Sequence, residues 1–145
     1  MIKIFISCGG GMSSSALVQK LRREAANQNL EDMVQFDFSP FSLAARDYSG
    51  YDIIMVCPHQ RYRVKDYNDR FIKNEIPIYV LPTRIYGTMK LNTIIQDAED
   101  IIEIFKSKPK NPVFFPGEED PLKVMRIEPF NLKEYNAYSR KEKSH

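Results

Sequence analysis

The sequence predicts an α/β fold: a doubly wound, four-stranded parallel sheet in the strand order 2-1-3-4, with helices on both faces and a C-terminal extension. Two observations carry this prediction. Short apolar runs alternate four times with segments whose apolar residues recur at helical spacing. The connections between them are short, which is typical of right-handed crossovers between parallel strands. We therefore expect the carboxyl ends of the strands to meet at one edge of the sheet, where such folds bind their ligands.

The first half of the chain contains the clearest elements. The run from Ile2 to Ile6 is short, β-branched and ended by Ser7 and glycines, which predicts a strand. From Ser13 onward, apolar residues return every three or four positions, which predicts a helix to about Asn29. We expect Lys20, Arg22 and Arg23 to form a solvated face of this helix, and the alternative is a surface where a partner docks. By the same reasoning we expect strands at 34–38 and 53–56, a short helix at 42–47 and a helix after Pro58.

The second half completes the sheet and then changes character. We expect a strand at 76–81, with Pro77 early in it, and a strongly amphipathic helix at 91–105. Residues 107–145 hold five of the nine prolines and lack clear periodicity, so we divide the chain into a domain at 1–106 and a Pro-rich, aromatic C-terminal extension at 107–145. The content of Phe and Tyr favours packing of part of this extension over a disordered linker.

Composition limits the classes of function. The 145 residues are 43% hydrophobic and 28% charged, with a formal net charge of +2, which suits a compact domain and does not suggest nucleic-acid binding. No apolar run reaches the roughly 18 residues of a membrane span, and residues 1–7 are too short for a secretory signal core. We therefore expect a cytoplasmic protein without direct membrane insertion.

The segment after the first strand has the composition of an anion site. Three glycines, Gly9 to Gly11, follow Cys8 and allow close approach of backbone N–H groups, while serines at the helix start add donors or cap the helix. The unpaired N–H groups and the dipole of a helix N-terminus favour phosphate, and they also lower the pKa of a thiol. This pattern indicates phosphoryl transfer through Cys8. The residue types alone equally allow a tight turn beside a small buried cysteine.

Two other phosphate motifs do not fit. A nucleotide P-loop places Lys directly after its last glycine, whereas no Lys follows here until Lys20. A thiol phosphatase of the C-x5-R type needs Arg six positions after the cysteine, and this chain has Ser14 there. Without that guanidinium the bidentate clamp on the phosphoryl oxygens is missing.

The loop closely resembles the pattern C-x-x-G-M-S-[ST]-S of the IIB subunits of the lactose/cellobiose class of the bacterial sugar phosphotransferase system (PTS). An apolar strand precedes it, and Tyr86-Gly87 and the stretch Pro58, Arg61, Tyr62 are similar to later parts of such subunits. The likeness covers about residues 1–105. One departure is Lys90-Leu91, where members often have Asp-Gly. The loop residues that match are Cys8, Gly9, Gly10, Gly11, Met12, Ser13, Ser14 and Ser15.

The resemblance implies a phosphoryl carrier and assigns its partners. Cys8 would form the phosphocysteine intermediate and residues 9–15 would bind the phosphate. The donor would be a phosphohistidine on a IIA protein, and the acceptor a sugar, such as cellobiose or lactose, held by the membrane permease IIC. The family needs no metal or nucleotide cofactor. Two alternatives stay open: a non-transporting regulatory IIB-like module, which the extension suggests, and a thiol phosphatase, against which Ser14 argues.

Residues after the third and fourth strands are candidates for the rim of the site. Arg61 would assist an incoming phosphohistidine partner, and His59 is either an acid or phosphoryl acceptor or simply an exposed loop residue. Tyr62 and Tyr86 are expected to pack at the rim. In the strand order 2-1-3-4, Cys57 lies near Cys8. We expect it to be a buried thiol because cytosolic disulfides are rare, and the alternative is a redox bond that requires Cα atoms within about 7 Å.

Overall fold

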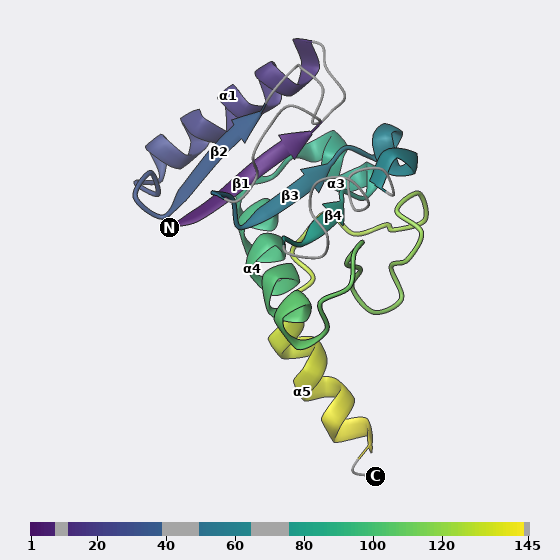
Figure 1. Cartoon of the computed structure of the whole chain (residues 1–145). Coiled ribbons are helices and arrows are strands. Elements are labelled where there is room, and N and C mark those ends of the chain that lie inside the picture. The colour runs from purple at the N-terminus through teal and green to yellow at the C-terminus, as the bar shows by residue number, and fades with distance from the viewer. Residues whose placement is uncertain (8–11, 39–49, 65–75, 144–145) are drawn as a thin grey trace.

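The computed structural model of the chain describes residues 1–7, 12–38, 50–64 and 76–143. Its sheet contains β1 (Ile2–Ser7), β2 (Val34–Phe38), β3 (Ile53–Val56) and β4 (Ile78–Val80). The strands are parallel and lie in the order β2-β1-β3-β4, which confirms the predicted topology. All four arrows in Figure 1 point the same way, so the strand carboxyl ends share one edge.

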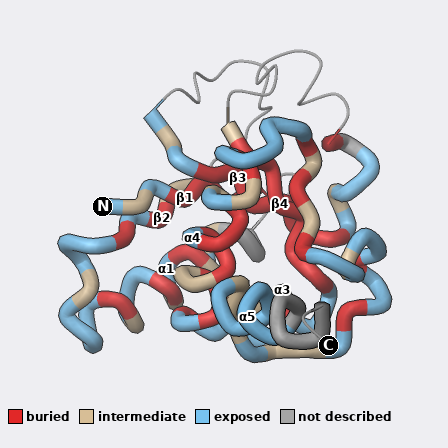
Figure 2. Tube along the Cα trace, turned by 90° about the horizontal axis from the view of Figure 1, so that it is seen from below, coloured by how far each residue is buried: buried red, intermediate tan, exposed pale blue. Residues whose placement is uncertain are grey.

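Residues on one face of the sheet pack against the helices. Helix α1 (Met12–Asn27) contributes Val18 and Leu21, and α4 (Leu91–Ser107) contributes a longer apolar stripe to the same cluster. Figure 2 shows buried positions running along the strands and recurring at intervals on α4. The stripe of α4 recurs every three or four residues, as expected for an amphipathic helix, and consists of Leu91, Ile94, Ala98, Ile101 and Phe105.

A second apolar cluster lies on the opposite face. Phe5, Ile54 and Val56 alternate along β1 and β3 with residues of the first cluster, and Val64 joins them after the 3-10 helix η2 (Pro58–Arg63). The short helix η2 is the described part of the helix expected after Pro58. The helix expected at 42–47 lies outside the described residues.

Two helices were not expected from the sequence. Helix α3 (Thr83–Thr88) is only six residues long and follows β4 directly, too short for its periodicity to stand out. Helix α5 (Leu132–Lys143) lies near the end of the chain and projects away from the sheet in Figure 1. Its first turn contains Glu134, whose backbone N–H donates to Asn131 Oδ1 at 3.4 Å. No helix in the described residues is both long enough and apolar enough to cross a membrane.

The segment after α4 packs against the edge of the sheet. Asn111 accepts a hydrogen bond from Ile78 N at 2.8 Å and donates one to Ile76 O at 2.7 Å. Two residues later, Val113 N donates to Ile78 O at 2.9 Å. Because β4 is the last strand on this side, these bonds pair backbone groups that an edge strand otherwise leaves open. Val113 and Phe115 then enter the main apolar cluster, so this part of the extension packs, as expected.

A buried polar cluster centred on Arg126 and Asp97 attaches a later part of the extension to α4 and β4. The Arg126 guanidinium contacts Asp97 Oδ2 of α4 at 2.9 Å and Glu118 Oε2 at 2.8 Å. Tyr79 of β4 donates to Asp97 Oδ2 at 3.2 Å, and Phe130 N donates to Asp97 Oδ1 at 3.0 Å. Burial raises the pKa of Asp97, and the nearby Arg126 charge and these hydrogen bonds offset this only in part. The cluster therefore joins the sheet, α4 and the extension.

Candidate functional site at the carboxyl edge of the sheet

Three neighbouring strands bring the candidate residues to one edge. β1 ends at Ser7, directly before the segment 8–11, and α1 begins at Met12. In the next strand, Cys57 N donates to Ser7 O at 3.0 Å, and beyond it Leu81 N donates to Val56 O at 2.8 Å. The hydrogen bonds between β1, β3 and β4 thus continue to the carboxyl ends of these strands. The segments that follow the three strands therefore begin at the same edge of the sheet.

The glycine-rich segment itself, Cys8 to Gly11, lies outside the described residues. Met12, Ser13 and Ser14 form the backbone of the first turn of α1, and their side chains are likewise outside the description. The first turn contains no acidic residue, so no carboxylate there opposes an anion at the N–H groups of the helix start. Ser15 is half-buried, and its Oγ accepts a hydrogen bond from Gln19 Nε2 at 3.5 Å.

The structure brings two of the four predicted rim residues into contact. The ring of His59, in η2, meets the ring of Tyr86, in α3, edge to face with 5.8 Å between centroids. Arg61 Nη1 donates to Pro58 O at 3.0 Å, within its own turn, and the side chain stays exposed. Tyr62 is 69% exposed and does not pack into the core, in contrast to the expected rim packing. Tyr86 is half-buried against the main apolar cluster, as expected.

Two polar residues near this edge were not singled out as candidates from the sequence. Lys20 was assigned to a solvated helix face, but its Nζ donates to Thr88 O at 3.1 Å and thus joins α1 to the end of α3. A cation at a helix C-terminus is stabilised by the carbonyl groups there. Gln60, in η2, has a buried Oε1 atom without a hydrogen-bond partner within the described part of the chain. No pattern in the sequence indicates the Lys20 contact or the burial of the Gln60 carbonyl, because both depend on how separate elements meet.

Cys57 differs from the expectation in one respect. Its side chain is fully buried in the main apolar cluster, as predicted, but it is disulfide-bonded rather than a thiol. The expectation of a thiol rested on the rarity of disulfides in the cytosol, which concerns the cell compartment and not the position of the residue in the fold. In the structure, Cys57 directly follows β3 and lies beside the end of β1. The chain contains one other cysteine, Cys8.

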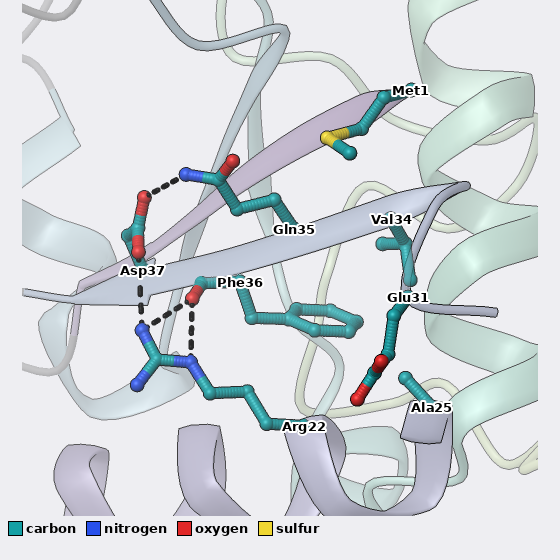
Figure 3. Close-up of a pocket in the computed structure, with 8 residues that line it drawn as sticks. All are labelled: Met1, Arg22, Ala25, Glu31, Val34, Gln35, Phe36 and Asp37. Carbon is teal, nitrogen blue, oxygen red and sulfur yellow. Dashed lines mark hydrogen bonds and ion pairs between the residues drawn. The ribbon is translucent and has the colours of Figure 1, made fainter. Parts of the chain in front are cut away.

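A cavity of about 300 Å³ lies beside β2, and its polar side chains have structural roles. Figure 3 shows Arg22 reaching from α1 to β2, where its Nη2 donates to Phe36 O at 2.7 Å and contacts Asp37 Oδ1 at 3.1 Å. Arg22 thus lies on the exposed side of α1, as predicted, and its guanidinium in addition binds β2. Burial acts to raise the pKa of Asp37, but hydrogen bonds from Gln35 and Tyr51 and the Arg22 charge outweigh it and hold the pKa below its usual value.

This cavity contains neither a nucleophile nor an unpaired anion-binding group among the residues that line it. No group of three or more His, Cys, Asp or Glu side chains that could hold a metal ion occurs in the described ranges. The carboxyl edge of the sheet, where the glycine-rich segment begins, therefore remains the candidate site.

Comparison with known proteins identifies the family. Residues 3–97 match the family model described as "PTS system, Lactose/Cellobiose specific IIB subunit". A solved structure of the lactose-specific IIB component domain of the phosphoenolpyruvate:carbohydrate PTS from Streptococcus pneumoniae is similar in fold, with a TM-score of 0.50. It shares 14% sequence identity, and the similarity covers 73% of this chain and 95% of that one. The family match spans well over half of the sequence. The chain therefore belongs to the lactose/cellobiose-specific IIB family and is a PTS component with a role in sugar phosphoryl transfer.

Proposed function

We propose that this protein is a cytoplasmic phosphoryl carrier that accepts a phosphoryl group on Cys8 from a IIA phosphohistidine. It then passes the group to a sugar held by a membrane IIC permease. The observation that carries the proposal is the position of Cys8 in the sequence: it follows the last residue of β1, and α1 begins four residues later. Family membership and the loop sequence C-G-G-G-M-S-S-S support the same role.

The chemistry of the proposed transfer needs no cofactor from this chain. The Cys8 thiolate attacks the phosphorus atom, an S–P bond forms, and the P–N bond to the donor histidine breaks. In the second step a sugar hydroxyl oxygen attacks phosphorus, the S–P bond breaks, and the thiolate is regenerated while the hydroxyl proton passes to a base. Backbone N–H groups of residues 9–15 would stabilise the three phosphoryl oxygens in both steps.

The rim formed by η2 and α3 would receive the two partners in turn. Arg61 is exposed there and would attract the anionic phosphohistidine, while the His59 and Tyr86 rings hold the two segments together. The sugar binds to IIC in this scheme, and we propose a β-linked disaccharide such as cellobiose or lactose, in keeping with the family.

Mass spectrometry of the reconstituted phosphorylation chain tests the proposal. The reduced protein is incubated with phosphoenolpyruvate, the general PTS proteins and candidate IIA proteins, and the site of any added phosphoryl group is mapped. We expect one label that Cys8→Ser abolishes and that Ser107→Ala, at an exposed position at the end of α4, leaves in place. No label with any IIA protein would contradict the carrier function. A label that no IIC membrane passes to sugar would instead favour a regulatory IIB-like module.

A further inference from the structure

One turn of the C-terminal extension, residues 121–125, lies against the helix that follows β4. Pro121 O accepts a hydrogen bond from Thr83 N, in the first residue of α3, at 3.2 Å. Met125 O accepts one from Arg84 Nη1 at 3.1 Å. In Figure 1 this part of the extension runs beside α3. Because α3 directly follows β4, the turn borders the rim that α3 forms with η2 at the carboxyl edge of the sheet.

The turn is anchored on its inner side and leaves three side chains exposed. Pro121 and Val124 are buried, which attaches the turn to the rest of the protein. Asp120 fixes its start, since Oδ1 accepts a hydrogen bond from Leu122 N at 3.0 Å and the carbonyl oxygen accepts one from Lys123 N at 3.1 Å. The exposed residues of this fixed backbone are Leu122, Lys123 and Met125.

Two of the exposed side chains are large and apolar. Leu122 is 53% exposed and Met125 is 66% exposed. Single apolar residues are common on protein surfaces, whereas a group of them is typical of an interaction site. Methionine also adapts its unbranched side chain to the shape of a partner. Since the backbone of the turn is already ordered, binding through these side chains would cost little conformational entropy.

The charges around the turn favour an anionic partner. The sequences of η2 (PHQRYR) and α3 (TRIYGT) contain no acidic residue. Glu119 and Asp120 precede the turn, and Asp120 is bonded to the backbone of the turn itself. Three exposed cations form no ion pair with a carboxylate among the described residues: Arg61, Arg84 and Lys123. A histidine that carries a phosphoryl group is anionic, whereas a sugar is neutral, so this surface fits the phosphoryl donor better than the acceptor.

The turn is an addition to the family domain. The family model matches residues 3–97, and the turn lies beyond them in the extension. Its contacts with Thr83 and Arg84 nevertheless attach it to the matched part of the chain. The extension therefore enlarges the surface of the domain beside the rim.

We propose that Leu122, Lys123 and Met125, together with Arg84 of α3, form a docking surface for a IIA protein that carries a phosphohistidine. The proposal rests on the function proposed above, because it concerns the donor of the same phosphoryl group. The two apolar side chains would pack against the donor, and the two cations would attract its negative charge. Because the turn lies outside the family domain, the surface would select the IIA protein that is matched to this chain.

Transfer kinetics test the docking surface. Wild type and the double variant Leu122→Ser/Met125→Ser serve as acceptors for each candidate IIA protein, phosphorylated with phosphoenolpyruvate and the general PTS proteins. We expect the KM for the double variant to rise about tenfold with kcat nearly unchanged, because binding is lost while the reacting groups are untouched. The matched control Met33→Ser/Tyr138→Ser, whose side chains are 62% and 63% exposed, should leave both constants unchanged.

A charge reversal tests the electrostatic part of the surface. Lys123→Glu should lower the association rate with the phosphorylated IIA protein at least about threefold at low ionic strength, and added salt should reduce the difference. Lys133→Glu, at an exposed position of α5, is the control and should associate as the wild type does. Equal rates for the Lys123 variant and the wild type would show that the turn does not face the donor.

Binding measured separately from labelling distinguishes the docking surface from the carrier function. If a phosphorylated IIA protein binds the wild type more tightly than the double variant but no label reaches the chain, docking stands and the carrier function is wrong. If label is transferred with equal KM to the wild type and the double variant, the docking surface alone is wrong. If no IIA protein binds or labels the chain, both are wrong.

Other occupants of the surface would give different results. A dimeric wild type and a monomeric double variant in light scattering would assign the surface to a second copy of the chain and overturn the proposal. A double variant that accepts phosphate normally but delivers it slowly to sugar in IIC membranes would assign the surface to the permease instead. Should the double variant fold poorly, as judged by its thermal transition, Leu122→Gln/Met125→Gln provides the same comparison.

Discussion

Replacement of Arg126 by Met should destabilise the protein strongly by leaving a buried carboxylate without its cation. The Asp97 side chain is 0% exposed, and Arg126 contacts its Oδ2 at 2.9 Å. Removing one partner of a buried ion pair costs about 3–5 kcal/mol. Asp97 would keep the Phe130 N–H at 3.0 Å and the Tyr79 hydroxyl at 3.2 Å, so we expect the lower end, about 3 kcal/mol.

Chemical unfolding in urea measures this loss, and a surface pair provides the control. In the control variant Lys106→Met, the lost partner is Glu103 at 3.5 Å, and both side chains are more than 60% exposed. An exposed pair contributes within about 0.5 kcal/mol, so the control should unfold almost as the wild type does. Methionine retains an apolar stem at both positions, which makes the two variants comparable.

The pH dependence separates loss of charge pairing from loss of packing. Burial raises the pKa of Asp97, and the Arg126 charge is the largest influence that lowers it, so the pKa should rise further in Arg126→Met. A carboxyl group with a higher pKa in the folded state binds its proton preferentially there. Its contribution to stability is therefore present at low pH and lost as the pH rises through the folded-state pKa.

The deficit of Arg126→Met should consequently be smaller at about pH 5 than at about pH 8. Adding Asp97→Asn should recover part of the loss, because it removes the unpaired charge. A deficit below about 1 kcal/mol, or one that does not shrink on acidification, would refute the electrostatic explanation and point to packing alone.

Two further variants test contacts made by single polar side chains. Asn111→Ala should lower the free energy of unfolding by about 2–4 kcal/mol, because it leaves Ile78 N and Ile76 O at the β4 edge unpaired. The control is Asn92→Ala, at an exposed position of α4. Equal stability of the two variants would contradict the role of Asn111 at the sheet edge. Gln60→Met should leave the free energy of unfolding unchanged or raise it by about 1 kcal/mol, because it removes a buried carbonyl that has no donor among the described residues. A decrease of more than about 1 kcal/mol, measured by thermal or urea unfolding, would show that this carbonyl is paired.

Prediction of the sheet succeeded because its signals are local. The strands at 34–38 and 53–56 agree with β2 and β3 residue for residue, and the amphipathic stripe that begins at Leu91 marks α4. Each depends on a period or composition that a short window contains. Helix α3 has only six residues, too few for a helical repeat of apolar residues to be recognised. Helix α5 packs little: residues 133–138 are exposed, so the apolar stripe that marks α4 is weak there.

Part of the candidate site was also predictable from the sequence. The order of residues from Ser7 to Ser15 is a continuous motif, and a motif of this kind does not depend on tertiary contacts for its recognition. The contacts between η2 and α3 were not predictable. His59 and Tyr86 lie far apart in the chain, and their rings meet because two separate strands end at the same edge.

The sequence by itself determined the alternating α/β pattern and the family motif around Cys8, since both are encoded in neighbouring residues. Only the tertiary structure decided how the extension packs, because Arg126 and Asp97 come together through contacts that no local pattern contains. It likewise decided the position of Cys57, which follows β3 and lies beside the end of β1. The register of two parallel strands sets that position, and a shift of one residue would turn the side chain to the opposite face of the sheet.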